Sequence, residues 1–346
     1  MTTSDIRIMT YNMGSSIKDY ELPHLVNNPT TPEVRSKEFP EKYRMAQTKT
    51  ASLADQAEIF CLQEVGNWNE RPLIQELQRR KFTFLPKLPA PGEALDAVIA
   101  VAPRFRLVTG FGPNKGSHWI VAKILDRHTQ AYMAVASAHM TGFSLEEYRN
   151  MKTVQQKELE TRNWKGDQAA LVENVNTWSA DCSLQIIAAD VNANPEVFPE
   201  GFQSFTENGF QTLRTGQPTN AYAFGIDPNA EVDEVPDRVR ELDFVFTKAT
   251  KRATTICQRI WAAFRAVFFQ RFSNYTTSID LRNPFGPAPK QAGKEMQWNF
   301  DNASDHLPVF ARITPVFTPS KICKAARCIC GLFARIFCCR GTPQST

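Results

Sequence analysis

Six short apolar runs, each carrying a polar group at or near one end, constrain the fold of this chain more than any other feature. Such runs, rich in Val, Ile, Phe and Ala, are typical of buried β-strands. A carboxylate, amide or imidazole at the end of a strand lies at the rim of a sheet, where loops build sites on a rigid scaffold. The runs are Ile6–Asn12, Ile59–Glu64, Ala134–His139, Gln185–Asn192, Glu241–Phe246 and Ser304–Phe310.

The polar groups of these runs are spread along nearly the whole chain of 346 residues. A chain of this length can bury a full core as one large domain or two small ones. Because one site would draw on residues from 12 to 306, we expect one catalytic domain, residues 1–315, followed by a tail, residues 316–346. The candidate site residues are Asn12, Glu64, His139, Asp190, Asn192, Asp243, Asp305 and His306.

In order, these runs contain the motifs YN, QE, AH, AADVN, LDFVF and SDH. No single motif is specific, but the ordered set resembles the endonuclease/exonuclease/phosphatase superfamily. That superfamily includes pancreatic-type deoxyribonucleases, abasic-site endonucleases, deadenylases, inositol-polyphosphate 5-phosphatases and neutral sphingomyelinases. The resemblance covers roughly residues 5–313. Ala189 stands where the family usually has Gly before the Asp, and either small residue lets backbone come close.

The sequence predicts an α+β fold, because strands and helices are mixed without strict alternation. The resemblance implies a four-layer αββα sandwich, in which two packed, mostly antiparallel sheets are flanked by helices. The composition predicts further strands and helices between the motifs. The strands are Asp96–Val101, Arg106–Phe111 and Trp119–Leu125, and the helices are Tyr43–Gln56, Leu73–Lys81, Leu145–Glu160 and Gln168–Trp178.

The resemblance implies hydrolysis of a phosphoester with Mg²⁺ as cofactor, for which Mn²⁺ can substitute. This reaction requires charge neutralisation, an in-line water and a route for protons. Mg²⁺ prefers oxygen ligands, so Glu64 is the first candidate ligand, assisted by Asn12 and completed by Asp305. Taken alone, Glu64 would fit a strand cap or a lysine partner equally well.

Asp190 and Asn192 are two positions apart, so on an extended segment their side chains project to the same side. Asp190 would orient or deprotonate the attacking water, and the Asn192 amide would hold a phosphate oxygen. The following Asn194–Pro195 pair also favours an Asx turn here, which is compatible with either role.

His139 and His306 are two of the five histidines, and imidazole suits proton transfer near neutral pH. By resemblance, Asp243 pairs with His139 and keeps it positively charged against the phosphate. His306, beside Asp305, would bind the phosphate or act as general base. Which histidine moves the proton stays open at this point.

The segment Pro113–His118 carries the letters PNKGSH. Its NKG part resembles, faintly, an inositol 5-phosphatase motif, which would make Lys115 and His118 substrate-binding residues. The same letters suit an ordinary hairpin turn.

Two segments combine basic and apolar residues. The first, Ile256–Phe272, lies in an interval, 248–303, that is long for a connection in a compact domain. On a helical wheel most of its large apolar residues share one side, which fits a membrane-docking element or a helix packed on the domain.

The second segment is the tail Lys321–Arg340, whose cysteines suit S-acylation next to a basic helical face. Metal binding and a packed C-terminal helix are the alternatives. The cysteines are Cys323, Cys328, Cys330, Cys338 and Cys339.

The net charge of +4 is a mild excess and does not by itself indicate a nucleic-acid partner. Neither a secretory signal nor a long apolar span is evident, so we expect an intracellular protein. We also expect a monomer, and the two basic and apolar segments predict peripheral membrane association. The sequence therefore predicts a metal-dependent phosphoesterase that acts on a membrane phospholipid, either sphingomyelin-like or a phosphoinositide. The alternatives are a nuclease, which the acidic loop at 225–237 disfavours, and a membrane-recruited binding module with a decayed site.

Overall fold

Two six-stranded sheets form the centre of the described part of the chain in this computed structural model. The described residues are 5–14, 48–66, 68–88, 90, 95–111, 118–140, 154, 166–179, 181–193, 199–216, 219, 242–249, 271–281, 306 and 308–318. The first sheet has the order β11-β12-β1-β2-β4-β3 and the second β5-β6-β7-β8-β10-β9.

The strands of the first sheet come from both ends of the described chain. They are β1 (Ile6–Asn12), β2 (Ile59–Val65), β3 (Thr83–Leu85), β4 (Leu95–Val101), β11 (Arg271–Leu281) and β12 (Val309–Thr318). The second sheet is built from the middle of the chain. Its strands are β5 (Phe105–Phe111), β6 (Trp119–Asp126), β7 (Ala131–His139), β8 (Leu184–Asp190), β9 (Gln211–Leu213) and β10 (Asp243–Ala249).

Within the described residues, two neighbouring pairs are parallel, β1 with β2 and β7 with β8. The remaining hydrogen-bonded neighbours are antiparallel. The mostly antiparallel arrangement that the sequence predicted is therefore confirmed.

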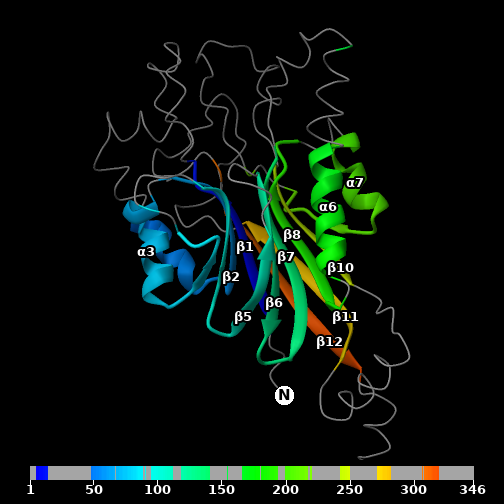
Figure 1. Cartoon of the computed structure of the whole chain (residues 1–346), viewed down its shortest axis with the longest axis horizontal. Coiled ribbons are helices and arrows are strands. Elements are labelled where there is room, and N and C mark those ends of the chain that lie inside the picture. Colours follow the sequence, from blue (N-terminus) through cyan, green and yellow to red (C-terminus); the bar gives the residue numbers. More distant parts are fainter. Residues whose placement is uncertain are drawn as a thin grey trace, which may run out of the picture.

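Helices cover the outer faces of both sheets, as Figure 1 shows. Leu73, Ile74 and Leu77 of α3 (Pro72–Arg79) pack with Phe60 and other residues of the first sheet. On the second sheet, α6 (Asp167–Trp178) and α7 (Gln203–Glu207) contribute to a separate apolar cluster. The short 3-10 helices are η3 (Ala51–Asp55), η4 (Trp68–Glu70) and η6 (Pro199–Phe202). The four-layer αββα sandwich is confirmed.

A third apolar cluster fills the space between the sheets. On β1, Ile6 and Ile8 face this central cluster, while Met9 and Tyr11 face the helix layer. A strand with helices on one side and a second sheet on the other is apolar on both faces. This double burial explains why the central strands are nearly continuous apolar runs in the sequence.

Most predicted elements lie within three residues of the observed ones, and the larger differences occur near β11 and β12, where the predicted run Ser304–Phe310 is observed as Val309–Thr318. The helical interpretation of Ile256–Phe272 is wrong at its end, because Arg271 and Phe272 begin β11. The tail expected from residue 316 begins later than predicted, because β12 continues to Thr318 in register with Arg271. Both segments pair with a distant strand, which a local pattern does not reveal.

Parts of other predicted elements lie outside the described residues, among them the tail 319–346, residues 256–270 and nearly all of Leu145–Glu160. Within Tyr43–Gln56, the structure describes the short 3-10 helix η3. Among the residues that can be described, none belongs to a helix with the length and apolar character needed to cross a membrane.

Candidate active site

Strand direction brings the predicted polar residues to one edge of the sandwich. β1, β2, β7 and β8 end at this edge. β10 begins there, because it is antiparallel to β8 with Asp243 opposite Asp190. β12 is antiparallel to β1 and also begins there, at Val309, three residues after His306. The edge therefore collects side chains that are far apart in the sequence.

Side-chain alternation places most of these groups on the faces between the sheets. On β1, Ile8 belongs to the central cluster, and Asn12 lies four positions further along the same face. On β7, His139 lies four positions after Val135 on the same face, and on β8, Asp190 lies two positions after Ala188 on the same face. The space between the sheets is thus apolar at its centre and polar at this edge.

Glu64 reaches the site through an unusual backbone conformation. The regular alternation of β2 puts Cys61 in the central cluster and Gln63 after it on the same face. Glu64 has a positive φ of 51°, in the left-handed region that few non-glycine residues adopt. Its carboxylate Oε1 accepts a hydrogen bond of 3.1 Å from Asn12 Nδ2.

Four pairs of described residues, each with one member from either sheet, line the edge. We refer to them as the cross-sheet pairs. In order across the sheets they are His306–Asp243 at 2.8 Å, Asn12–Asp190 at 2.9 Å, Glu64–His139 at 3.3 Å and Asp96–His118 at 3.7 Å.

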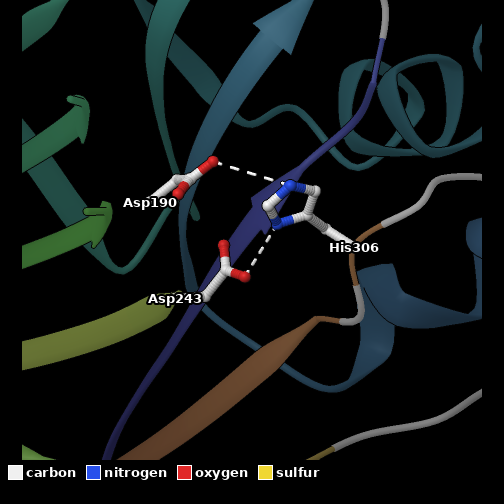
Figure 2. Close-up of side chains that lie close together, drawn as sticks. All are labelled: Asp190, Asp243 and His306. Atoms are coloured by element: carbon white, nitrogen blue, oxygen red, sulfur yellow. Dashed lines mark hydrogen bonds and ion pairs between the residues drawn. The ribbon is translucent and has the colours of Figure 1, made fainter. Parts of the chain in front are cut away.

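His306 lies between two carboxylates, as Figure 2 shows. Its Nδ1 is 2.8 Å from Asp243 Oδ2, and its Nε2 is 3.6 Å from Asp190 Oδ2. The pairing of Asp243 with His139 that the sequence analysis expected is therefore wrong. Asp243 lies on β10 and His139 on β7, with β8 between them, whereas His306 comes from the opposite sheet and faces β10.

Asp243 is completely buried. Burial raises the pKa of Asp243 to about 6, because a charged carboxylate loses its hydration there. The neighbouring His306 opposes this rise in the pKa, and the Asp190 carboxylate adds to it. The Thr219 hydroxyl accepts hydrogen bonds from the backbone N–H groups of Leu242 and Asp243, so the start of β10 is fixed in place.

Asp190 and Asn192 form the turn that the sequence predicted as one of two possibilities. The backbone N–H of Asn192 donates to Asp190 Oδ1 at 2.9 Å, and Asn192 has a φ of 53°. Its side-chain Nδ2 donates to the Met140 carbonyl at 2.7 Å. Asn192 thus ties the end of β8 to the end of β7, and its contact with a phosphate stays a prediction.

His139 has one ring nitrogen in the site and one without a described partner. Its Nε2 lies 3.3 Å from Glu64 Oε1 and 3.9 Å from Asp190 Oδ2. Its Nδ1 is buried, and no described residue accepts or donates a hydrogen bond there. A buried polar atom without a partner is uncommon, and a catalytic role is one explanation for it.

The donor set fits a hard divalent cation. Glu64, Asp190 and Asp243 supply carboxylate oxygens, the ligands that Mg²⁺ prefers, and Asp243 Oδ1 is buried without a hydrogen-bond partner among the described residues. The ligand atoms of Asp190, Asp243 and His306 all lie within 4.8 Å of one another. Asn12 Oδ1 already accepts a bond from the Gly14 N–H, so a cation would use its second lone pair.

Some predicted site residues lie outside the described part of the chain. These are Asp305, Lys115 and the tail cysteines Cys323, Cys328, Cys330, Cys338 and Cys339. His118 is described, and it lies beside His139 with its ring paired to Asp96. Sequence reasoning missed Asp96, although it begins a predicted strand and the rule of polar strand ends would have found it.

The sequence analysis also gave no role to the polar layer directly beneath the site. Gln63 Nε2 donates to Ser137 Oγ on the opposite sheet at 3.1 Å, and its Oε1 accepts from Thr10 Oγ1 at 3.3 Å. Ser137 Oγ in turn donates to the Leu62 carbonyl at 3.1 Å. All three side chains are fully buried. This layer joins β1, β2 and β7 immediately below the candidate site.

Comparisons with known proteins add information at the level of the fold. No protein-family model matches the chain, and no curated protein sequence matches it. Similar solved structures include an endonuclease/exonuclease/phosphatase from Bacteroides vulgatus, with 11% identity and a TM-score of 0.54, covering 90% of this chain and 100% of that one. The beta toxin 275-280 from Staphylococcus aureus has 12% identity and a TM-score of 0.51, covering 89% of this chain and 99% of the other.

A further endonuclease/exonuclease/phosphatase family protein, from Bacteroides thetaiotaomicron, has 11% identity and a TM-score of 0.50, with coverages of 90% and 99%. Likeness at such low identity shows the fold alone. It agrees with the two packed sheets and the helix layers described above. The chain therefore has the endonuclease/exonuclease/phosphatase fold.

Proposed function

We propose that this protein is a divalent-metal-dependent hydrolase of phosphoester bonds. The observation that carries the proposal is the convergence of Asn12, Glu64, His139, Asp190, Asp243 and His306 on one edge, with hydrogen bonds and close pairs between the two sheets. Side chains from six strands or strand starts would not meet here through packing alone, because buried charges are costly unless they are paired.

Asp190 is the group that we assign to the attacking water. It is almost completely buried, and Asn12 Nδ2 donates to its Oδ2 at 2.9 Å. This bond holds the carboxylate in one orientation, while Asn192 N–H fixes the other oxygen. A carboxylate held in this way can orient a water and accept its proton.

His306 is the group that we assign to the phosphate and to proton transfer. Its Nδ1 is hydrogen-bonded to Asp243, which leaves Nε2 on the side of Asp190. An imidazole fixed at one nitrogen by a carboxylate presents the other nitrogen in a defined direction. The side chain can therefore donate to a phosphate oxygen without reorganising.

A hard divalent cation, Mg²⁺ or Mn²⁺, would be held by Glu64 with Asn12 and Asp305, and when bound it would neutralise the developing charge on the phosphate. Glu64 also lies next to His139 Nε2. His139 can thus contact the same phosphate from the side of β7.

For the substrate we propose a membrane phospholipid, sphingomyelin-like or a phosphoinositide. The support is the sequence of Ile256–Phe272 and Lys321–Arg340, which both combine basic residues with aromatic or apolar ones. A basic face would meet anionic headgroups at roughly 1 kcal/mol per Lys or Arg near the surface. Acylation of the tail cysteines would add about 0.8 kcal/mol per buried CH₂.

The decisive experiment measures turnover of bis(4-nitrophenyl) phosphate, phospholipid vesicles, inositol phosphates, DNA and RNA. EDTA should abolish activity, and Mg²⁺ or Mn²⁺ should restore it. Asp190→Asn, His139→Ala and His306→Ala should each lower turnover by about 10²-fold or more. The control is His128→Ala, an exposed histidine at the far end of β6. Full activity in EDTA, or normal rates in all three variants, would contradict the proposal.

Membrane attachment through the tail needs its own test, with a truncation placed after β12. Removal of residues 319–346 keeps β12 whole, whereas a cut at 316 would remove its last residues. The truncated protein should keep activity on a soluble phosphodiester and lose co-sedimentation with anionic liposomes. Equal liposome binding by both proteins would exclude the tail as an anchor.

A further inference from the structure

The cross-sheet pairs become more exposed to solvent from the His306–Asp243 pair to the Asp96–His118 pair. The side chains of the His306–Asp243 and Asn12–Asp190 pairs are at most about 5% exposed. Those of Glu64 and His139 are 13% and 18% exposed, and those of Asp96 and His118 are 36% and 46% exposed. The row is thus buried at the His306 end and open to solvent at the His118 end. Among the described members of the row, the outermost pair is the one most accessible to the larger part of a substrate.

The outermost pair continues the site by one strand on each sheet. Asp96 lies on β4 opposite Glu64, because Gln63 and Val65 are in register with Ala97 and Leu95. His118 precedes β6, and its carbonyl accepts a 2.6 Å hydrogen bond from the His139 N–H. The rings of His118 and His139 are 6.3 Å apart, edge to face. Both members of the pair therefore adjoin residues of the proposed phosphate site.

The chemistry of this outer pair suits a hydroxyl group. His118 Nδ1 faces Asp96 Oδ2 at 3.7 Å, which is too far for a direct hydrogen bond between the two side chains. An imidazole offers a donor and a carboxylate offers an acceptor, and a hydroxyl can use both at once. A second phosphate at the same place would face the Asp96 carboxylate and be repelled.

We propose that Asp96 and His118 bind a hydroxyl on the alcohol part of the substrate, next to the phosphate, and so favour hydroxyl-bearing phosphoesters. The inference rests on the proposed phosphoesterase function and adds a specificity subsite to it. Neither residue takes part in bond cleavage. Glycerol 3-phosphate and methyl phosphate form a matched pair of probes, because both carry a phosphate monoester but only the first carries hydroxyls.

The experiment measures dissociation constants of both probes by calorimetry, with Mg²⁺ present. Wild type should bind glycerol 3-phosphate about threefold to tenfold more tightly than methyl phosphate, the gain expected from a hydrogen bond. His118→Ala and Asp96→Ala should abolish this preference and leave the affinity for methyl phosphate unchanged. His118→Asn, which keeps a side-chain donor, should retain part of the preference. His128→Ala, at the opposite end of β6, is the matched control and should behave as wild type.

The outcomes separate this inference from the proposed function. Equal affinity of wild type for both probes, or a preserved preference in both alanine variants, would overturn the hydroxyl subsite. Loss of methyl phosphate binding in those variants would also overturn it, because the pair would then support the phosphate site itself. Failure of wild type to bind either probe would contradict the proposed phosphate site, and the inference would fall with it.

Discussion

Asp243 shows how a single buried carboxylate is held by residues from both sheets. Its Oδ2 contacts His306 of the first sheet, while Asp190 lies beside it on β8. Its Oδ1 is buried without a described hydrogen-bond partner. Because burial dominates these influences, the pKa of Asp243 is raised to about 6. The pH dependence of folding follows from this value.

A group whose pKa is higher in the folded protein stabilises the fold most when it is protonated. The contribution of Asp243 is therefore complete below about pH 4, near its pKa in the unfolded chain, and is lost as the pH rises through about 6. Asp243→Asn has no proton to release. We expect its stability relative to wild type to increase between pH 4 and 7, on the order of 3 kcal/mol. Urea unfolding at several pH values measures this difference, and parallel curves for the two proteins would contradict it.

The sequence predicted which polar residues lie at the sheet edge better than it predicted their partners. Asn12, Glu64, Asp190, Asp243 and His306 each stand at the end or start of an apolar run, so a local pattern predicts their place at a sheet edge. The pairing of Asp243 with His306 depends on how two sheets face each other. That relation joins residues 63 positions apart, and periodicity within a strand does not encode it.

At the scale of strands, the polar layer beneath the site fixes the position of one sheet relative to the other. Gln63 and Ser137 come from β2 and β7, and each precedes a site residue, Glu64 by one position and His139 by two. A buried side-chain hydrogen bond keeps its partners in one relative position, because breaking it leaves polar groups without partners. Both residues of the QE motif therefore have an explanation. Gln63 fixes the end of β2, and the Glu64 carboxylate stands next to it.

Removal of this contact should affect stability and activity together. Ser137→Ala leaves Gln63 Nε2 with the Cys61 carbonyl alone among its described partners, and we expect a cost of about 1–3 kcal/mol. Gln63→Leu should cost a similar amount. The double variant should lose less than the sum, because both residues belong to one network. Urea unfolding of wild type, the two single variants and the double variant measures this coupling. Strictly additive losses in the free energy of unfolding would show that the two side chains act independently.

Boundaries were the least predictable property of the elements. β11 and β12 pair over ten registered positions, from Arg271 opposite Thr318 to Leu281 opposite Val309. Before this pairing is known, the basic and aromatic residues near 271 fit a helix, and the Pro-containing segment after 313 fits a linker. Each of the two segments forms a strand because it pairs with the other, which is a tertiary effect.

At the scale of the whole molecule, an ion cluster fastens the sheets at the end opposite the site. Arg104 donates through Nε and Nη2 to the two oxygens of Asp126, at 2.9 Å and 2.8 Å. Its Nη1 reaches the Asp5 carbonyl and the Glu58 carboxylate before β1 and β2. Although burial opposes it, the Arg104 guanidinium holds the pKa of Asp126 below its usual value. The sandwich is therefore joined by polar contacts at both ends.

Arg104→Met should destabilise the protein without altering the candidate site. The change leaves the buried Asp126 carboxylate without its cation, which costs about 3–5 kcal/mol. Arg79→Met is the matched control, because Arg79 pairs with Glu76 on an exposed helix surface, where such pairs contribute at most about 1 kcal/mol. Thermal unfolding compares the two variants. Turnover per folded molecule should equal wild type in both, and a large fall for Arg104→Met would mean that the far cluster also shapes the site.

The path of the chain through the two sheets has a consequence for biosynthesis. The first sheet is begun by β1 to β4, the second is then built entirely, and β12 returns at the end to lie beside β1. His306 arrives with this last strand, after every other described member of the site has left the ribosome. A nascent chain halted before β12 would present Glu64 and Asp190 but lack the imidazole between its carboxylates. The proposed hydrolytic activity should therefore begin during translation only once β12 is released.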